Sequence, residues 1–543
     1  MWPSLLTGLL LAMAFPLRIG EFELPNLGWL AWIALVPLFV SLRMASPWEA
    51  FRRTFVAAVI YYGGSLYWVY TAMYTYGHLS PAVSGAVLLL MVVILATYIG
   101  MAPLFTRLIA RRLEHEPLWL LPSAWVAIEL ARNYGPCGGF PWINLAQSQY
   151  AYTPLIQVVD LTGISGLAFA IVWTNRWLAH VVARCWGGGQ EHRALGEGGW
   201  RWAEAATWLT FALLAGMAGY GAVRFAQVRG DLFRWPSYGV ALLQGNIPQE
   251  EKWRPGLEEE QLSQFRALLS QVDTAPIDLV VWPEASYPWA VGDEQRALDV
   301  GHFLPAGGPQ TDRSLPWPML IGALRADGNG ATRRLANSVF GVGRDGTIVG
   351  RYDKTHLVPF GEYVPYRQIF SFARKLAAPI GNLHPGEEIA PITIEDVAIG
   401  PLICYEDIFP EIARAHALRG AHFFANLTND AWYGWSGAAR QHMALSVFRA
   451  VENRRYLVRA TNTGMSAIVD PLGRVLMAGG LFEPAVLAGQ IRLGFRDTIY
   501  TRFGDWFAYA CIGTVLIAAG FSLRRRRILL RGHRGTEWVN LRS

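Results

Sequence analysis

The sequence has few charged residues and few cysteines, and both shortages narrow the class of protein. Charged side chains make up 16% of its 543 residues, against about 25% in soluble globular proteins. Its four cysteines form no C-x-x-C pair, so neither a zinc site of that kind nor a thioredoxin-like redox site is predicted. The sequence also lacks an HExxH zinc motif, a Walker phosphate loop and a GxGxxG motif between a strand and a helix, so these common enzyme classes have no support.

Apolar residues are abundant instead. They account for 52% of the chain, which contains 23 Trp, 21 Tyr and 26 Phe, a composition typical of a membrane protein. The formal net charge is +6, and the basic residues stand beside apolar runs rather than on one face. We therefore interpret them as signals of membrane topology and expect no nucleic-acid partner.

Eight apolar segments approach the roughly 20 residues that a helix needs to cross a bilayer, although the first two and the fifth are short or contain Pro and Gly. Seven stand in a row, a long gap follows, and one lies near the C-terminus. The first lacks the basic n-region and the small-residue cleavage site of a signal peptide, so we interpret it as a retained span. The segments are Met1–Pro16, Leu27–Leu42, Phe55–Tyr74, Ala82–Phe105, Leu118–Leu130, Leu155–Val182, Trp202–Val223 and Trp506–Leu523.

Arginine clusters give these segments an orientation. The clusters follow the second, fourth, sixth and eighth segments, whereas the alternate loops hold almost no Lys or Arg. If the basic loops are cytoplasmic, both termini lie inside a bacterial inner membrane, and the region between the seventh and eighth segments lies in the periplasm. The predicted domains are a seven-span bundle at 1–224, a periplasmic domain at 225–497, an eighth span at 498–527 and a cytoplasmic tail at 528–543.

The region between the seventh and eighth segments has the pattern of an α/β domain. Short apolar runs bounded by turn residues alternate with helical periodicity at Pro410–Leu418 and Ala438–Asn453. Hairpin turns are predicted at 344–346 and 470–473. We expect two layers of strands covered by helices. The predicted strands are Tyr238–Leu243, Ile277–Trp282, Met319–Leu324, Ser338–Val342, Val397–Ile403 and His422–Ala425.

Three residues with reactive side chains stand at or near the ends of these predicted strands: Glu284, Lys354 and Cys404. A thiol is a weak nucleophile until it loses its proton, so Glu284 is the candidate base. Lys354, with the backbone N–H of Tyr405, is the candidate stabiliser of a thiolate and an oxyanion. Each has a structural alternative: a helix N-terminal carboxylate, a surface lysine and a buried cysteine that packs as a small hydrophobe. Their occurrence together favours the catalytic interpretation.

The order Glu–Lys–Cys, in the contexts Trp282-Pro283-Glu284 and Cys404-Tyr405-Glu406, resembles the nitrilase, or carbon–nitrogen hydrolase, superfamily over about half of the chain. That resemblance implies an αββα sandwich. With the flanking apolar segments, the whole chain resembles the apolipoprotein N-acyltransferase family, which implies a multi-pass helical bundle of about eight spans joined to the α/β sandwich. Further stretches that carry the resemblance are Leu243–Gln249, Lys252-Trp253, His356–Pro365, Asn426–Tyr433 and Arg459–Gly464.

The resemblance implies an acyl transfer in two stages. Cys404 would take an acyl chain from a phospholipid, typically phosphatidylethanolamine, as a thioester. The chain would then pass to the free α-amino group of an S-diacylglyceryl cysteine at the N-terminus of an apolipoprotein, giving a triacylated lipoprotein by ping-pong kinetics. The resemblance also implies no metal, no organic cofactor and a surrounding of membrane lipid, and we expect a monomer.

Four supporting residues are also implied by the resemblance: Trp253, Glu362, Tyr405 and Glu406. Glu362 would orient Lys354 or assist the base, Glu406 would hold the loop after Cys404, and Trp253 would pack on a lipid or a mobile loop. The structural alternatives are buried ion-pair partners for the two carboxylates and ordinary packing for the two aromatic residues.

Two other functions fit parts of the pattern. A membrane-anchored nitrilase-type amidase or hydrolase would use the same three residues with water in place of the amine, but it would need one anchor rather than eight spans. A transporter or scaffold with an inactive enzyme domain would not need the intact triad, and the apolar segments lack the paired intramembrane charges of a transport path.

Two aromatic stretches are candidate contacts with lipid or with the active site. Phe140-Pro141-Trp142 lies in a loop predicted to face outward. The stretch Tyr366–Ile380 interleaves apolar residues with Arg and Lys, so it is either an amphipathic arm that lies on the bilayer and gates lipid entry or an ordinary surface helix.

The membrane-arm hypothesis is testable by a double substitution. Phe370→Asp with Phe372→Asp is expected to reduce acyl transfer, because the two charges oppose insertion of the arm into the bilayer surface, while the fold remains intact. Turnover of a labelled phospholipid and the unfolding temperature measure the two effects. Unchanged turnover would contradict the hypothesis.

Overall fold

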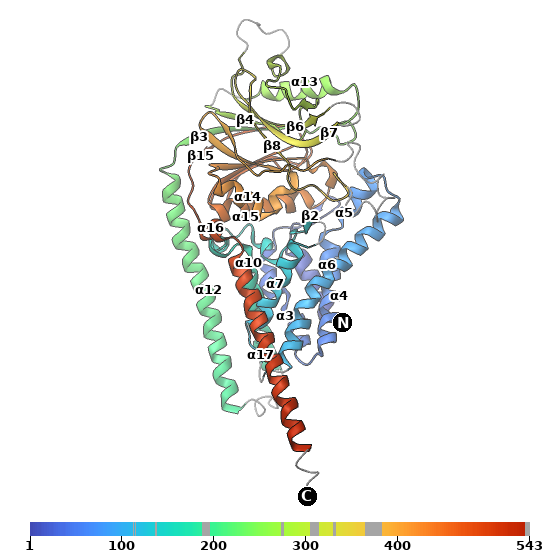
Figure 1. Cartoon of the computed structure of the whole chain (residues 1–543), viewed down its shortest axis with the longest axis vertical. Coiled ribbons are helices and arrows are strands. Elements are labelled where there is room, and N and C mark those ends of the chain that lie inside the picture. The colour runs from blue at the N-terminus through green and yellow to red at the C-terminus, as the bar shows by residue number, and fades with distance from the viewer. Residues whose placement is uncertain are drawn as a thin grey trace.

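The computed structural model describes residues 1–111, 113, 116–135, 138–186, 196–272, 276–304, 314–328, 333–363 and 383–537. Figure 1 shows an α/β domain above a group of helices, and the last long helix, drawn in red, extends away from that domain. The predicted arm at Tyr366–Ile380 lies outside the described residues.

Each of the eight apolar segments forms helix in the part of the chain described. The ends of α4 (Pro47–Ser65) illustrate how the sequence sets them. Ser46 accepts a hydrogen bond from the Glu49 backbone N–H, and the Glu49 carboxylate accepts one from the Ser46 N–H, which is a capping box. The other helices are α1 (Trp2–Met13), α2 (Ala31–Ala34), α3 (Val36–Leu42), α5 (Trp68–Thr71), α6 (Pro81–Ala110), α7 (Leu120–Asn133), α8 (Thr153–Ile156), α9 (Val159–Thr162), α10 (Ile164–Trp186), α12 (Gly196–Leu232), α16 (Ile499–Phe503) and α17 (Trp506–Glu537).

Fewer of the described helices are long and apolar enough to cross a membrane than the sequence predicts. Three satisfy both conditions: α6, the Glu204–Leu232 part of α12 and the Trp506–Arg525 part of α17. A fourth span results if Thr153–Thr162 and Ile164–Cys185, which meet at an angle of 118°, are counted together. The prediction of eight spans is therefore not confirmed.

The difference arises where the backbone breaks a continuous apolar run. Between α9 and α10 the chain turns sharply at Gly163, whose φ of +62° suits glycine. The segment 28–42 begins as a 3₁₀ helix and changes to a new helix at Val36; Pro37, in the first turn of α3, has no N–H to continue the preceding helix. Helix α7 has 14 residues, about the length of the apolar segment predicted there and shorter than a membrane span.

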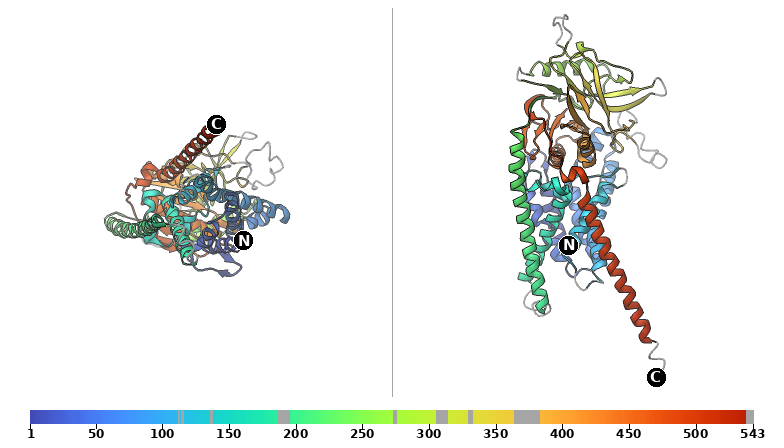
Figure 2. Two further views of the ribbon diagram at one scale, coloured as in Figure 1. Left: turned by 90° about the horizontal axis from the view of Figure 1, so that it is seen from below. Right: turned by 60° about the vertical axis from the view of Figure 1, so that its left-hand side comes forward.

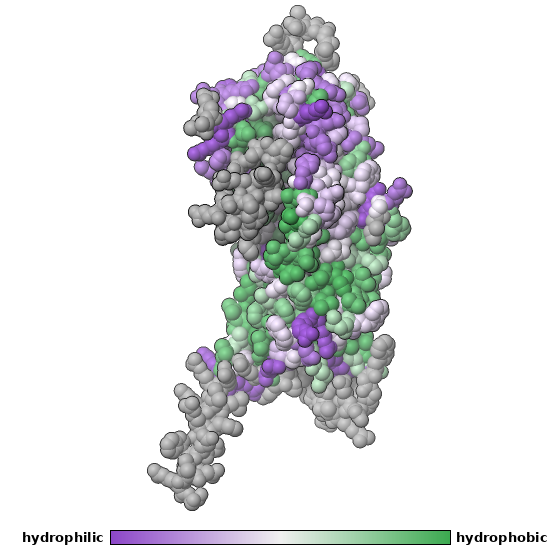
Figure 3. All heavy atoms as spheres, turned by 90° about the vertical axis from the view of Figure 1, so that its right-hand side faces the viewer, coloured by the Kyte–Doolittle hydropathy of each residue, from purple (hydrophilic) through white to green (hydrophobic). Residues whose placement is uncertain are grey.

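The long helices nevertheless expose apolar side chains. Figure 2 shows α12, in green, and α17, in red, flanking the shorter helices. On the face drawn in Figure 3, hydrophobic residues gather around the helical part, while hydrophilic residues cover much of the α/β domain. This distribution is typical of a membrane protein. Exposed apolar residues on the two helices are Trp208, Leu209, Phe211, Val223, Trp506, Tyr509, Leu516, Ile517, Phe521 and Leu523.

Two β-sheets form the α/β domain, as the sequence predicts. The seven-stranded sheet has the order β15-β3-β4-β6-β7-β8 with β5 beside β6, and the six-stranded sheet has the order β14-β13-β12-β11-β10-β9. The strands are β3 (Ser237–Gln244), β4 (Leu279–Val281), β5 (Val291–Gly292), β6 (Met319–Asp327), β7 (Arg334–Val342), β8 (Ile348–Asp353), β9 (Ile392–Ile394), β10 (Val397–Ile403), β11 (Phe423–Thr428), β12 (Tyr456–Thr461), β13 (Ala467–Val469), β14 (Val475–Ala478) and β15 (Ala485–Arg492); a separate small hairpin pairs β1 (Arg18–Ile19) with β2 (Phe22–Glu23).

Helices cover the outer face of each sheet, which gives the αββα arrangement. Helix α13 (Glu258–Leu269) covers the seven-stranded sheet, and α14 (Pro410–Leu418) and α15 (Ala438–Asn453) lie between the six-stranded sheet and the helical part, as Figure 1 shows. Strand β10 and helices α14 and α15 have the predicted bounds. The two predicted hairpins join β7 to β8 and β13 to β14 as antiparallel pairs.

Hydrophobic packing is continuous between the two parts of the protein. One buried cluster extends from Leu38 and Trp125 of the helical part through Phe448 of α15 to Leu402 of β10. A second cluster lies between the seven-stranded sheet and α13, where Phe265 and Trp282 stack with ring centroids 4.6 Å apart. The domain therefore shares its main core with the helices beneath it.

A buried ion pair also joins the two parts. Arg454, which follows α15 with a φ of +50°, is fully buried. Its guanidinium donates to the Asp160 carboxylate of α9 at 2.7 and 2.9 Å and to Gln157 Oε1 at 2.6 Å. Arg224 of α12 donates to the same carboxylate at 2.6 Å. These bonds fix the α/β domain on α9 and α12.

Removing the Arg454 guanidinium is expected to weaken this junction. Arg454→Met leaves buried acceptors without a donor and should lower the stability by about 3–5 kcal/mol. The measurement is the unfolding temperature of the full-length protein in detergent. Arg502→Met is the control, because it removes only an exposed ion pair with Asp497 and should change stability by less than about 0.5 kcal/mol. Equal effects of the two substitutions would contradict the role of Arg454.

Candidate active site

Cys404 ends strand β10 in a strained backbone conformation. Its φ is +53°, in the left-handed region that residues other than glycine rarely adopt. The 3₁₀ helix Cys404–Ile408 begins at the cysteine, and Asn426 of β11 donates from Nδ2 to the Cys404 carbonyl oxygen at 2.9 Å. The thiol therefore stands at a sharp turn after a buried strand, and the residue is 8% exposed.

Glu284 follows β4 in a turn that depends on a glycine in the next strand. A Cβ on Gly322 of β6 would lie 2.3 Å from the Pro283 carbonyl oxygen and 2.8 Å from the Glu284 Cα, so a side chain there would displace the turn. Ala285, the next residue, has a φ of +45°. The Glu284 carboxylate is held by Asn337, whose Nδ2 donates to it at 2.7 Å.

Lys354 follows β8 and is fully buried between two carboxylates. Its Nζ donates to Glu362 Oε1 at 2.9 Å and lies 3.7 Å from Glu284 Oε1. Burial alone would lower the pKa of Lys354, but Glu362, Glu284 and Cys404 raise it above its usual value. The lysine is therefore an ammonium at neutral pH.

The Cys404 thiol is an electrostatic neighbour of both residues. Burial raises the pKa of Cys404, and Glu284 also raises it, whereas Lys354 lowers it. The structure thus brings the three predicted residues together. A thiolate at this place depends on a nearby cation and on an acceptor for its proton.

Asn337 and Glu362 complete the ion cluster. Asn337 Nδ2 also donates to Glu362 Oε1, at 3.1 Å, so one amide bridges the two carboxylates. Glu362 Oε2 accepts from the Val358 backbone N–H at 2.9 Å. Glu362 was predicted to orient Lys354, and its geometry fits that role. Asn337 was missed, because nothing in its sequence context distinguishes it from other strand residues.

Glu406 accepts hydrogen bonds from the loop that follows Lys354. Its Oε1 accepts from the Thr355 and His356 backbone N–H groups at 2.8 and 3.1 Å and from the Tyr352 hydroxyl at 2.9 Å, and its Oε2 accepts from the Ile403 N–H at 2.8 Å. The carboxylate therefore connects the turn that carries Cys404 to the loop that carries Lys354.

The other two supporting residues lie around the same cluster. The Tyr405 hydroxyl donates to the Leu357 carbonyl oxygen at 2.9 Å, and the Lys354 Nζ lies 5.6 Å from the Tyr405 ring centroid. Trp253 is half-buried, with the Nζ of the adjacent Lys252 5.8 Å from its ring. Tyr405 thus holds the Lys354 loop, while Trp253 is only partly buried.

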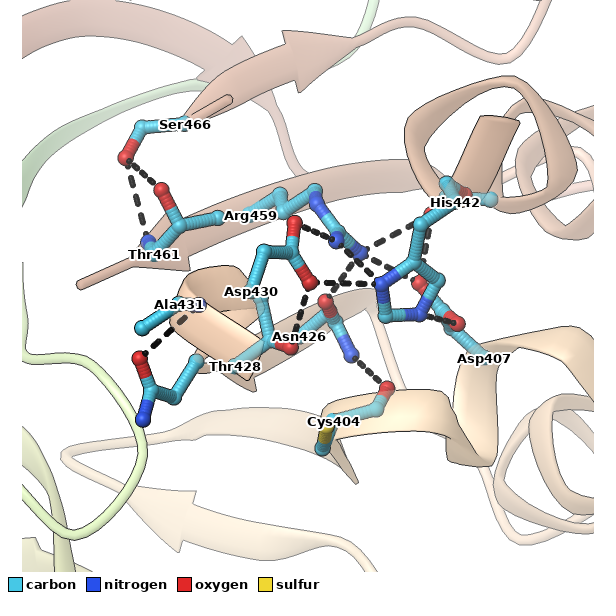
Figure 4. Close-up of polar contacts among 12 residues, drawn as sticks. Cys404, Asp407, Asn426, Thr428, Asp430, Ala431, His442, Arg459, Thr461 and Ser466 are labelled. Atoms are coloured by element: carbon cyan, nitrogen blue, oxygen red, sulfur yellow. Dashed lines mark hydrogen bonds and ion pairs between the residues drawn. The ribbon is translucent and has the colours of Figure 1, made fainter. Parts of the chain in front are cut away.

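A fully buried polar network lies behind the Cys404 turn, and Figure 4 shows its side chains converging. Arg459 of β12 donates to Asn426 Oδ1 at 2.6 Å, which fixes the amide that holds the Cys404 carbonyl. Burial and Arg459 would lower the pKa of His442, but Asp407 and Asp430 raise it. The network consists of Asp407, Asn426, Asp430, His442, Ser446 and Arg459.

No pattern in the sequence predicted a role for this network. One feature of the sequence does indicate a buried polar network: Arg459 stands within the apolar stretch Tyr456–Thr461. A charged side chain is fully buried only when it is paired with polar or charged partners. The stretches Asn426–Tyr433 and Arg459–Gly464 carry the family resemblance, but that resemblance implied no role for the residues of the network.

The network continues into the helical part through Trp142. The indole ring packs on His442 with centroids 5.2 Å apart, and its Nε1 donates to Gln441 Oε1 at 2.9 Å. Gln441 Nε2 in turn donates to the Pro16 and Ser65 carbonyl oxygens at 3.0 and 3.1 Å. Trp142 therefore contacts the polar network that lies behind the Cys404 turn.

Among the residues that the structure describes, no group of three or more His, Cys, Asp or Glu side chains is arranged to hold a metal ion.

Comparisons with known proteins cover both parts of the chain. Residues 7–177 match the family described as apolipoprotein N-acyltransferase N-terminal domain, and residues 239–499 match the family described as carbon–nitrogen hydrolase. Apolipoprotein N-acyltransferase of Geobacter metallireducens is 37% identical over 97% of this chain and 95% of that protein. The enzymes of the same name from Nitrosomonas europaea and Pseudomonas putida are 32% and 30% identical over 90% and 95% of this chain, and over 92% and 97% of their own lengths.

Solved structures resemble about half of the chain. A nitrilase-superfamily protein of Saccharomyces cerevisiae, Nit3, is 19% identical, with a TM-score of 0.36 over 47% of this chain and 90% of that one. A carbon–nitrogen hydrolase of Helicobacter pylori is 18% identical, with a TM-score of 0.35 over 47% of this chain and 89% of that one.

The contacts of Glu406 predict the effect of removing its charge. In Glu406→Gln an NH₂ group replaces one acceptor oxygen and faces a backbone N–H, so the substitution should lower stability by about 1–3 kcal/mol. It should also slow alkylation of Cys404 by iodoacetamide, because the Cys404 turn loses a fixed contact. Glu395→Gln, at an exposed ion pair with Arg344, is the control. Similar behaviour of the two variants would contradict the role of Glu406.

Proposed function

The chain belongs to the apolipoprotein N-acyltransferase family, and from that premise we propose how its residues carry out the reaction. The protein is an N-acyltransferase of the carbon–nitrogen hydrolase superfamily that acts in lipoprotein maturation. In our proposal Glu284, Lys354 and Cys404 transfer an acyl chain from a phospholipid, typically phosphatidylethanolamine, to a diacylated apolipoprotein.

In the first stage the Cys404 sulfur attacks the acyl carbonyl carbon of the phospholipid ester. Glu284 accepts the thiol proton, a C–S bond forms, and negative charge develops on the carbonyl oxygen. The Lys354 ammonium and the Tyr405 backbone N–H stabilise this oxyanion. When the tetrahedral intermediate collapses, the ester C–O bond breaks, and Glu284 gives its proton to the departing lysophospholipid oxygen. The product is a thioester on Cys404.

In the second stage the free α-amino group of the S-diacylglyceryl cysteine attacks the thioester carbonyl carbon. Glu284 accepts a proton from the amine as the C–N bond forms, and the same groups stabilise the oxyanion. The C–S bond then breaks, the thiolate takes the proton back from Glu284, and the triacylated lipoprotein leaves. The first product departs before the second substrate reacts, so ping-pong kinetics follow.

The observation that carries this proposal is the buried lysine between two carboxylates beside the strained cysteine. Glu362 accepts from Lys354 at 2.9 Å, while Glu284 stands 3.7 Å away. Because Glu362 already neutralises the ammonium, Glu284 is available to exchange a proton with substrate. Glu406 and Tyr405 fix the turn that carries Cys404 relative to the loop that carries Lys354. Trp253 offers an apolar surface to an acyl chain.

We also propose a membrane arrangement for the enzyme. The α/β domain at 225–497 lies in the periplasm, both termini are cytoplasmic, and the shorter helices complete a bundle of eight segments with α6, α12 and α17. The direction of α17, which runs away from the α/β domain in Figure 1, and the arginines at the end of α6, Arg107 and Arg111, support this arrangement. The enzyme then works as a monomer beside the outer leaflet, where the phospholipid donor and the lipid-anchored acceptor both reside.

Acyl transfer is testable with the purified full-length protein. Incubation with phosphatidylethanolamine that carries a labelled acyl chain is expected to give a hydroxylamine-sensitive adduct on Cys404. Addition of a diacylated lipopeptide with a free amine should then move the label to the peptide. Release of labelled fatty acid without transfer would favour a hydrolase. No adduct, with Cys404→Ser behaving like the parent, would refute the thioester mechanism.

Variants of the other two residues test their roles in the same assay. Glu284→Gln should slow adduct formation by about 100- to 10,000-fold, because the thiol loses its proton acceptor. Lys354→Met should slow it by about 100- to 1,000-fold, because the oxyanion loses a charged donor. Arg351→Met, at an exposed position of β8, is the control for substitution near Lys354. Adduct formation at the parent rate in either active-site variant would contradict its assigned role.

A further inference from the structure

A second lysine, Lys252, lies beside the candidate active site on a different loop. It stands in the turn after Pro248 and is 7% exposed. Its Nζ donates a hydrogen bond to the main-chain carbonyl oxygen of Glu284 at 2.8 Å. A lysine can usually extend its ammonium into water, and an ammonium buried in a protein loses solvation free energy. The burial of the Lys252 ammonium therefore requires a specific explanation.

The charges around Lys252 belong to the reacting groups. Burial lowers the pKa of Lys252 to about 8, and Glu284 and Cys404 act in the opposite direction. These two residues are the proposed base and the proposed nucleophile. The ammonium thus interacts with the two groups between which a proton moves in the first stage of the reaction.

A count of charges shows what the second lysine adds. Near the thiol, the Lys354 ammonium is shared between Glu362 at 2.9 Å and Glu284 at 3.7 Å. One cation and two carboxylates give this group a net charge of −1, and negative charge opposes formation of a thiolate. The ammonium of Lys252 brings the total to zero and lowers the cost of ionising Cys404.

We propose that Lys252 is a positioning residue for the acyl-transfer reaction: its ammonium holds the main chain of Glu284 and balances the second carboxylate when Cys404 loses its proton. This inference rests on the proposed roles of Glu284 and Cys404. It assigns Lys252 to formation of the thioester rather than to recognition of the apolipoprotein, because its contacts are with the base and the nucleophile.

The loop that carries Lys252 has contacts that do not depend on the ammonium. The Lys252 backbone N–H donates to the Pro248 carbonyl oxygen at 3.1 Å. Gln261 of α13 donates from Nε2 to the Glu251 and Lys252 carbonyl oxygens at 2.9 and 3.3 Å. We therefore expect the loop to keep its conformation when the lysine side chain is replaced.

Three substitutions separate charge from hydrogen bonding. Lys252→Met removes both, Lys252→Gln keeps a donor without the charge, and Lys252→Arg keeps both. Gln261→Ala is the matched control, because it loosens the same loop and leaves the charge in place. Two rates are measured across neutral and alkaline pH with the full-length enzyme in phosphatidylethanolamine vesicles: formation of the acyl adduct on Cys404 and alkylation of Cys404 by iodoacetamide, followed by peptide mass spectrometry.

The expected result is a shift of the pH profile. Without the cation the thiolate is less stable, so the pKa of Cys404 rises and the thiol ionises at higher pH. In Lys252→Met and Lys252→Gln the midpoints of both profiles should move upward by about one pH unit, which corresponds to a rate about tenfold lower near neutral pH. Rates should recover at alkaline pH. Lys252→Arg and Gln261→Ala should keep the parent midpoints.

The outcomes distinguish this role from simple packing. If Lys252→Gln and Lys252→Met slow the reaction but keep the parent midpoints, the lysine contributes only to structure and the inference is refuted. The glutamine variant retains a polar contact and provides the result if the methionine variant does not fold. A parent enzyme that forms no adduct would refute the proposed function itself, whereas a normal parent with unshifted variants refutes only the role of Lys252.

Discussion

Burial of the Lys354 ammonium is the constraint on which the architecture of the site depends. An ion transferred from water to a protein interior loses several kcal/mol of solvation free energy, which paired charges and well-directed hydrogen bonds must offset. Glu362 and Glu284 supply the negative charge, and these carboxylates then need donors of their own. Asn337 and the Val358 N–H meet that need. Strands β4, β7 and β8 and the loop after β8 are therefore held in one arrangement by a single positive charge.

The turn that carries Cys404 is restrained in a similar way from the opposite side. Its left-handed backbone is held through Asn426, and Arg459 fixes Asn426 from the adjacent strand. His442 extends this network to Trp142 of the helical part, and Gln441 reaches the Pro16 and Ser65 carbonyls. With the Arg454–Asp160 ion pair, these contacts make the geometry of the nucleophile depend on the membrane helices as well as on its own domain.

Local patterns in the sequence predicted much of the fold and the central part of the site. Apolar runs identified β10, and helical periodicity gave α14 and α15 their bounds, because these elements are long or strongly patterned. Glu284, Lys354 and Cys404 were recognised because reactive side chains follow buried strands. The bend at Gly163 was not predicted, since an apolar run does not reveal where its helix breaks. Asn337, His442 and Lys252 were missed as site residues, because their importance lies in partners that are distant in sequence.

The pairing of the first and last strands of the α/β domain bears on how the enzyme is made. Strand β15 runs antiparallel to β3, with Ala485 opposite Gln244 and Arg492 opposite Ser237. About 240 residues therefore have to emerge from the ribosome before the edge strand of the seven-stranded sheet is available, and contacts so distant in sequence form slowly. Until β15 has been synthesised, the edge of β3 that later pairs with it has no partner strand. Such an unpaired edge is a site for aberrant strand association. Strand β15, which completes the sheet, stands immediately before α16 and α17 in the chain, so this domain completes its fold only when most of the chain has been made.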